Sequence, residues 1–398
     1  MLSKAGARRQ ARRLAKPLKC NLKAPGWNLT TRAKLEQLIQ EGADKQLPVV
    51  FDFDNTIICG DISEATLATL VKSGLVKAAE LPETLSPPFR PPGRARIRLQ
   101  SCADPTEYYE AFLAPSAHGR ADPSPLANGY VWAVEVMEGL RPLDVVNATQ
   151  AAFKLSKAAK LVFIEVTPGK TAFPVPFFYP EMVELLAALL RHRFEVWIVS
   201  AGNVWSIRWM VQHVLNPSLR RVGLDEGVRA DHILGVSTLL ADKRDRLYKD
   251  ELLVRENAGY AALDKRALGA FKLTSRLQFP VPTYSGKLAC MFDAIGRSPY
   301  LYVGDSPGDH AMLEFSQNRL WIAQLEKPAY QRAALELIRK TGRRGWMVQA
   351  TLTRTAPGFV PDLKEVSRRL GRVPPKIRQS LRLLSSIGHP SSQKRANR

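Results

Sequence analysis

The sequence predicts an α/β protein with a parallel β-sheet, and three observations support this class. First, short apolar runs with the character of buried strands recur along the chain, at 47–53, 194–200, 298–305 and 319–324. Second, segments with helical apolar spacing alternate with these runs, at 180–193, 204–215 and 286–296. Third, the loops between them are short, as in a parallel sheet covered by helices on both faces.

Polar side chains stand where several predicted strands end. Asp52 and Asp54 close the first strand, Ser200 closes the second, and Asp305 closes the third. Ligands of open parallel sheets bind beyond the carboxyl ends of the strands. We therefore expect these four side chains to share one site.

Long stretches of different character interrupt the alternation. We predict a helical cap inserted after the first strand. It comprises a helical segment at 61–76, a Pro/Arg-rich loop and further helical sequence up to residue 160. A second insertion, at about 216–285, contains one predicted strand, HILGVST. The predicted organisation is a core of 41–60 and 161–340, a cap of 61–160, and basic extensions of 1–40 and 341–398.

The net charge of +21 is concentrated at the two ends. Residues 1–35 carry ten Lys or Arg and no acid, and residues 341–398 carry thirteen against two acids, whereas 36–340 is balanced. Such ends could bind nucleic acid or an anionic membrane, or simply be solvated. The charge says nothing about what the central domain binds.

The sequence favours a cytoplasmic protein. No window approaches the length of apolar sequence that crosses a bilayer, and the N-terminus lacks the apolar core of a secretory signal. Its Arg-rich, acid-free composition leaves organelle targeting open. The four cysteines have no disulfide or metal-ligand spacing; they are Cys20, Cys59, Cys102 and Cys290.

The segment DFDNT (52–56) places two carboxylates on one side of a strand end. One carboxylate can attack phosphorus, while the other protonates the leaving oxygen and later activates water. Phosphoryl transfer also requires neutralisation of the phosphate charge. Asp305 and Asp309 in GDSPGD offer oxygen ligands for Mg²⁺.

The phosphate group itself has three candidate binding elements. Ser200 and the backbone N–H groups of Ala201 and Gly202 can hold its non-bridging oxygens. Lys287, which opens a helix leading to the strand of Asp305, can neutralise the transition state. Other lysines nearby are alternatives: Lys243, Lys249, Lys265 and Lys272.

Together, DxDxT, a strand ending in SAG, a lysine and GDxxxD resemble the four motifs of the haloacid dehalogenase (HAD) superfamily of phosphatases, over most of 45–325. The resemblance implies a Rossmann-like core. It also implies that Asp52 is the nucleophile, Asp54 the acid and base, and Ser200 and Lys287 the phosphate ligands. It further implies Mg²⁺ held by Asp52, Asp305, Asp309 and the backbone carbonyl of Asp54. An acid at position 54 distinguishes the phosphatases from the dehalogenases of this superfamily.

The cap resembles the type-one cap of the phosphoserine-phosphatase-like branch, and the motifs are most similar to bacterial phosphorylcholine phosphatases. By that resemblance Glu64 contributes to recognition of choline. Aromatic faces suit a quaternary ammonium. The candidates are Tyr108, Tyr109, Tyr130 and Trp132, each of which could instead belong to the core of the cap.

Other functions remain open at this point. A phosphoserine phosphatase would need a cation for the substrate carboxylate, which Arg94, Arg96 or Arg98 could supply. Transfer of the phosphoryl group to an acceptor other than water would make the protein a phosphotransferase. The third alternative is a factor that acts at nucleic acid or membranes through its basic ends.

Overall fold

The computed structural model describes residues 19–90, 95–117, 126 and 128–388. Its centre is a seven-stranded sheet in the order β14-β13-β12-β11-β1-β6-β7, and β14 alone of these seven is antiparallel to its neighbour. The predicted α/β class with a parallel sheet is confirmed. The strands are β1 (Pro48–Phe51), β6 (Glu195–Asn203), β7 (Ile233–Val236), β11 (Leu301–Gly304), β12 (Asn318–Gln324), β13 (Trp346–Leu352) and β14 (Gly358–Val360).

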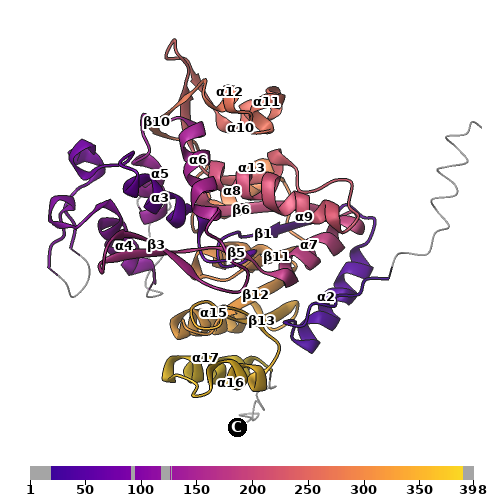
Figure 1. Ribbon diagram of the computed structural model, residues 1–398. Helices are drawn as coiled ribbons and strands as arrows, with labels where there is room; N and C mark the ends of the chain where they lie inside the picture. The colour runs from indigo at the N-terminus through magenta and orange to yellow at the C-terminus, as the bar shows by residue number, and fades with distance from the viewer. Residues whose placement is uncertain (1–18, 91–94, 118–125, 127, 389–398) are drawn as a thin grey trace, which may run out of the picture.

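Helices cover both faces of this sheet (Figure 1). Successive residues of a strand point to opposite faces. Val49 and Phe51 therefore pack in the cluster formed with α2 and α7, whereas Val50 packs in the cluster formed with α13, α14 and α15. These helices are α2 (Leu29–Gly42), α7 (Pro180–Arg191), α13 (Gly286–Ala294), α14 (His310–Phe315) and α15 (Pro328–Thr341).

The predicted helix at 204–215 contains a change of pitch. It forms α8 (Val204–Met210), then a wider π-helical turn over Val211–Leu215, and continues into α9 (Asn216–Arg221). Helix α8 begins directly after β6, and the Asn203 side chain accepts a hydrogen bond from Ser206 N there. This cap fixes the point at which β6 ends.

A two-stranded ribbon connects the cap to the core. Asn55, with a φ of 57°, and Gly60, with a φ of 95°, turn the chain back after β1, and Asn55 N donates to Gly60 O over 2.9 Å. Strand β2 (Ile58–Cys59) then pairs antiparallel with β5 (Phe177–Phe178). The chain therefore enters and leaves the cap at adjacent positions.

The cap extends beyond the predicted range. Besides its helices it contains a β-hairpin, formed by residues predicted to belong to the core. Ile164 and Phe173 of this hairpin pack in the same cluster as the cap helices, which lie together on the left of Figure 1. The cap elements are α3 (Ile62–Lys72), α4 (Pro105–Ala117), α5 (Gly129–Glu135), α6 (Pro142–Phe153), β3 (Val162–Thr167) and β4 (Thr171–Val175).

The second insertion has two parts. Its first strand, β7, joins the central sheet beside β6. The remainder forms a small antiparallel sheet and short helices at the top of Figure 1. These elements are β8 (Thr238–Ala241), β9 (Leu247–Tyr248), β10 (Lys272–Leu277), α10 (Asp250–Glu256), α11 (Ala258–Ala261) and α12 (Lys265–Leu268).

The predicted division of the chain is wrong at its C-terminal end. Strand β13 lies between β12 and β14 in the central sheet, and α17 (Pro375–Gly388) packs on α15, beside α16 (Leu363–Leu370). The prediction relied on the net positive charge of 341–398 and did not take account of its apolar residues, which form strands and helices. The described part of this segment therefore belongs to the folded core.

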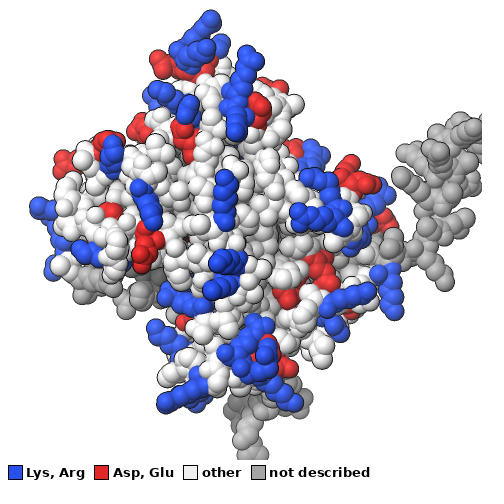
Figure 2. Space-filling model, in the orientation of Figure 1, with Lys and Arg blue, Asp and Glu red and all other residues white. Residues whose placement is uncertain are grey.

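The predicted N-terminal extension is also partly folded, because α2 and Trp27 are packed in the core. Residues 1–18 and 389–398, which hold much of the basic sequence, lie outside the described residues. Figure 2 shows Lys and Arg spread over the visible face among Asp and Glu. Binding of the basic ends to nucleic acid or membranes stays a prediction. Within the described residues, no helix combines the length and the apolarity needed to span a membrane.

We expect Phe359→Ala to destabilise the whole protein. Phe359 in β14 is 2% exposed, and its ring centroid lies 4.7 Å from that of Tyr179 and 5.4 Å from that of Trp27. Such a truncation costs about 3–5 kcal/mol in free energy of unfolding. Leu363→Ala, at a side chain 61% exposed, is the control and should change stability by less than about 0.5 kcal/mol. Equal stability of both variants in urea titrations would show that the C-terminal strands are not part of the cooperative core.

Candidate active site

All the predicted site residues except Asp309 and Glu64 line one pocket, at the carboxyl ends of β11, β1 and β6, three neighbours in the sheet. Asp52 and Asp54 follow β1, Ser200 lies near the end of β6, and Asp305 follows β11. The pocket encloses about 650 Å³, including space open to solvent. Its lining residues are Asp52, Asp54, Asn55, Asp61, Tyr130, Ser200, Ala201, Gly202, Tyr284, Lys287, Asp305, Ser306, Pro307, Gly308, Lys327 and Tyr330.

Lys287 is buried between two carboxylates. Its Nζ lies 2.8 Å from Asp52 Oδ1 and 2.7 Å from Asp309 Oδ1. None of the four alternative lysines lines this pocket. Lys287 comes from the first turn of α13, so the helix orients its ammonium toward the end of β1.

Asp309 holds the loop after β11 and Lys287 together through hydrogen bonds. Oδ1 accepts hydrogen bonds from Lys287 and, over 2.7 Å, from Tyr302 OH. Oδ2 accepts from the backbone N–H groups of Asp305 and Ser306, each over 3.0 Å, and from Ser306 Oγ. Both oxygens are thus engaged by donors of this chain. Asp309 therefore fixes the loop after β11 and holds Lys287 in place.

Asp54 is held from both sides. Its Oδ1 accepts a hydrogen bond from Ile62 N over 2.9 Å, and its Oδ2 accepts one from Ser200 Oγ over 3.3 Å. Burial, and then the charge of Asp61, raise the pKa of Asp54 well above its usual value. This carboxyl group can therefore carry the proton that a general acid must donate.

Position 202 must be glycine, because neighbouring side chains leave no room for a Cβ atom. Its N–H donates to Ser200 Oγ over 3.1 Å. A Cβ atom at this position would lie 2.4 Å from Ser63 Oγ and 2.9 Å from Asp54 Oδ2. The absence of a side chain lets the backbone of β6 lie against Asp54 and the first turn of α3.

Three buried carboxylates are close enough to hold one cation. Asp52, Asp305 and Asp309 each offer an oxygen, and these oxygens lie within 4.8 Å of one another. The Asp54 side chain is not in this group, so its predicted role through the backbone carbonyl stays a prediction. Thr56 Oγ1 donates to Asp305 Oδ1 over 3.1 Å, and Gln324 Nε2 donates to Asp305 Oδ2.

The charge balance of the site favours a bound cation. Burial raises the pKa of Asp52 to about 6, despite the nearby ammonium of Lys287. Burial and the charges of Asp52 and Asp309 raise the pKa of Asp305 well above its usual value. Lys287 does not neutralise all of these carboxylates. Because all the available ligands are oxygens, the arrangement fits a hard divalent cation.

The cap supplies a second set of polar groups. Asp61 caps α3, accepting from Glu64 N over 2.9 Å, and it lines the pocket. Glu64, the acid predicted to face the substrate, is not among the residues that line the pocket, and it accepts from Tyr109 OH over 3.3 Å. Burial, and next the charge of Asp61, raise the pKa of Glu64 to about 8.

The predicted aromatic residues have different positions. Tyr130 lines the pocket and Tyr109 contacts Glu64, whereas Tyr108 and Trp132 pack with each other in the core of the cap. The arginines proposed for a substrate carboxylate are not at the site. Arg96 and Arg98 are exposed and outside the pocket lining, and Arg94 lies outside the described residues.

Outside the motif segments, four lining residues were not predicted. Asp61 follows Cys59-Gly60 as an N-cap residue, and this helix-start pattern could have revealed it. Tyr284, Lys327 and Tyr330 come from loops and helix starts that only the tertiary fold brings to the site. No local sequence signal marks these three.

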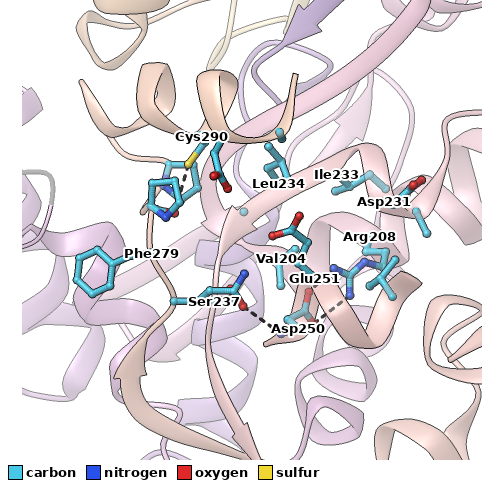
Figure 3. Close-up of a pocket in the computed structure, with 18 residues that line it drawn as sticks. Val204, Arg208, Asp231, Ile233, Leu234, Ser237, Asp250, Glu251, Phe279 and Cys290 are labelled. Carbon is cyan, nitrogen blue, oxygen red and sulfur yellow. Dashed lines mark hydrogen bonds and ion pairs between the residues drawn. The ribbon is translucent and has the colours of Figure 1, made fainter. Parts of the chain in front are cut away.

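A second pocket lies between β7, α8 and α10 (Figure 3). Arg208 and Asp250 form a buried ion pair in its wall, with Nη2 2.5 Å from Oδ2. The acids Asp231 and Glu251 at this pocket form ion pairs with neighbouring arginines. It contains no residue of the four motifs. The first pocket is therefore the candidate active site.

Comparisons with known proteins agree with the motifs. The chain is 25% identical over 316 residues to the phosphorylcholine phosphatase of Pseudomonas aeruginosa, covering 76% of this chain and 81% of that protein. This relative confirms the resemblance to a phosphatase of that kind. No protein-family profile matches the chain.

One solved structure supports the fold. A protein of unknown function from Anaerococcus prevotii shares it with a TM-score of 0.57 and 16% identity, over 87% of this chain and 98% of that one. A substrate-bound phosphoserine phosphatase superposes with a TM-score of 0.37 and 13% identity, covering 82% of this chain and 98% of that one. A score that low supports no conclusion about this chain.

We expect a divalent cation to stabilise the protein through Asp305. Millimolar Mg²⁺ should raise the melting temperature, because a cation that binds the folded state alone stabilises it. In Asp305→Asn the metal-dependent increase should be lost, because one of the carboxylate ligands is removed. Differential scanning fluorimetry with and without Mg²⁺ measures this effect. An undiminished increase in Asp305→Asn would contradict the assigned cation site.

Proposed function

We propose that the protein hydrolyses small phosphomonoesters with Asp52 as nucleophile and Mg²⁺ as cofactor. The main support is the arrangement of Asp52 and Asp54 at one strand end, with Lys287 2.8 Å from the first and Ser200 3.3 Å from the second. This arrangement provides a nucleophile, an acid and two phosphate ligands around one space. The phosphatase relative supports the same reaction class.

In the first step, an Asp52 oxygen attacks phosphorus and the bond from phosphorus to the alcohol oxygen breaks. Asp54 gives its proton to that oxygen, so the alcohol leaves neutral. The raised pKa of Asp54 suits this role. Lys287 contacts the attacking carboxylate and opposes the charge that accumulates on the phosphoryl group.

In the second step, Asp54, now ionised, takes a proton from water as the water oxygen attacks the aspartyl-phosphate. The bond between phosphorus and Asp52 breaks, releasing phosphate and restoring both carboxyl groups. Ser200 Oγ donates to Asp54, and the Gly202 N–H donates to Ser200 Oγ. Both donors would exchange these partners for phosphoryl oxygens when the substrate binds. Mg²⁺, held by Asp52 and Asp305, would supply further neutralisation of the phosphate charge.

Phosphorylcholine is the first substrate to test. Asp61 lines the pocket with Tyr130, Tyr284 and Tyr330, and its carboxylate accepts a hydrogen bond from Glu64 N. An acid with aromatic faces suits a quaternary ammonium. The name of the relative supports the same choice. Phosphoserine, and transfer to an acceptor other than water, are the alternatives that product analysis would identify.

Asp52→Asn should reduce Mg²⁺-dependent phosphate release from p-nitrophenyl phosphate by at least about a thousandfold, because the amide is not a nucleophile for phosphorus. Its circular dichroism spectrum should match the wild type. Asp293→Asn, at an exposed position of α13, is the matched control and should retain full activity. Undiminished turnover by a folded Asp52→Asn protein would disprove the mechanism.

The KM for phosphorylcholine should depend on the ionisation of Glu64. Since the pKa of Glu64 is raised to about 8, the carboxyl group is neutral below that pH and anionic above it. KM should therefore fall as pH rises from about 6.5 to 9, relative to KM for p-nitrophenyl phosphate, which carries no cation. Glu64→Gln should abolish this relative change. If the variant keeps the wild-type pH profile, Glu64 does not interact with the cation.

A further inference from the structure

Gln324 is the polar residue that closes the predicted strand 319–324, and none of the four motifs contains it. It is the last residue of β12 and is 1% exposed. A polar group buried to this degree requires a hydrogen-bond partner. Its Nε2 donates to Asp305 Oδ2, and Asp305 is one of the three carboxylates close enough to hold a cation. Gln324 therefore acts directly on a candidate metal ligand.

The lengths of two neighbouring strands place Gln324 beside Asp305. Strands β11 and β12 pair in parallel up to Gly304 and Trp321, and β12 then continues to Gln324 while it pairs with β13. Successive strand residues point to opposite faces, so Gln324 shares a face with Ile322, which packs in the cluster formed with α2 and α7. The extra length of β12 thus carries the amide past the end of β11, where Asp305 follows.

Two further buried side chains hold the end of β12. Trp321 Nε1 donates to Gln331 Oε1 over 2.8 Å, and Gln331 Nε2 donates to Gln324 O over 2.8 Å. An indole N–H can only donate, so it determines which end of the Gln331 amide faces Gln324. Trp321 and Gln331 are both fully buried. The backbone of Gln324 is therefore fixed by α15, and this limits how far its side chain can move from Asp305.

Both oxygens of Asp305 accept hydrogen bonds from neutral side chains. Thr56 Oγ1 donates to Oδ1 over 3.1 Å, and Gln324 Nε2 donates to Oδ2. An ionised carboxylate only accepts hydrogen bonds, so the nitrogen end of the Gln324 amide must face it. Lys287, by contrast, brings a positive charge to the other two carboxylates of the cation site. The neutral donors orient Asp305 and leave its negative charge for a cation to neutralise.

We propose that Gln324 is a positioning residue for the metal, because it sets the orientation in which Asp305 binds Mg²⁺. This inference rests on the assigned cation site and, for its activity readout, on the proposed function. Without the amide, Asp305 can rotate away from the carboxylate of Asp52, which carries the same charge. Loss of a group that orients a metal ligand typically weakens metal binding by about tenfold to a hundredfold. Gln324 contacts no reacting atom in this assignment, so its loss should change metal affinity rather than the chemical step.

Gln324→Met tests this role, since methionine has a similar length but no N–H donor. The dissociation constant for Mg²⁺, measured from the rise of the melting temperature with Mg²⁺ concentration, should increase roughly tenfold to a hundredfold. The Mg²⁺ concentration for half-maximal hydrolysis of p-nitrophenyl phosphate should increase by the same factor. The kcat at saturating Mg²⁺ should stay close to that of the wild type.

Two further variants complete the experiment. Gln324→Asn keeps an amide but is shorter by one methylene, so it should also weaken Mg²⁺ binding, and it decides the question if the methionine variant does not fold. The control is Gln212→Met, which removes an amide that donates to Val228 O over 3.1 Å, outside the pocket lining. It should leave the dissociation constant for Mg²⁺ unchanged.

An unchanged dissociation constant in a folded Gln324 variant would overturn the inference, and so would an equal increase in Gln212→Met. A wild-type melting temperature that does not respond to Mg²⁺ would overturn it as well, because Asp305 would then bind no cation. If Mg²⁺ binds but p-nitrophenyl phosphate is not hydrolysed, the proposed function fails, and the melting temperatures alone decide the role of Gln324.

Discussion

The active site depends on one interaction, the ammonium of Lys287 between the carboxylates of Asp52 and Asp309. Carboxylates buried together repel one another, and burial alone is costly for each of them. Lys287 offsets part of this cost and also links three elements, because Asp52 ends β1, Asp309 closes the loop after β11, and Lys287 begins α13. The same Asp309 carboxylate binds the backbone of that loop. The position of Asp52 and the shape of the loop are therefore determined together. A bound metal ion would neutralise the remaining negative charge.

In the proposed mechanism, different residues act on the phosphoryl group and contact the rest of the substrate. Groups that handle phosphorus come from strand ends of the core, where the parallel sheet brings Asp52, Asp54 and Ser200 together. Groups that would contact the rest of the substrate come from both parts of the molecule, with Asp61 and Tyr130 in the cap and Tyr284, Lys327 and Tyr330 in the core. The two parts meet at Asp54, whose Oδ1 accepts a hydrogen bond from Ile62 N in the first turn of α3. Asp54, the acid in the proposed mechanism, is thus held by a helix of the cap.

The sequence predicts the position of a site residue only where a local pattern of neighbouring residues marks it. Asp52, Ser200 and Asp305 could be placed because a buried strand followed by a polar residue identifies its own end. Lys327 could not, since nothing in the sequence shows that the loop after β12 turns toward the pocket. The C-terminal segment was misread because its basic charge was weighed above the apolar residues of β13 and β14. Glu64 was placed on the correct helix, but Asp61, one turn earlier, is the acid that lines the pocket, because capping directs its side chain there.

The ribbon of β2 and β5 has a consequence for how such an enzyme changes over time. Because Ile58 pairs with Phe178 and Cys59 with Phe177, everything between them is a loop whose ends are already closed. Lengthening a closed loop adds little entropic cost to folding, about 0.6 kcal/mol for each doubling. Insertions, deletions or exchange of the whole cap would leave the register of the central strands undisturbed. A chain built in this way can acquire new specificities by modular replacement while its catalytic residues stay the same.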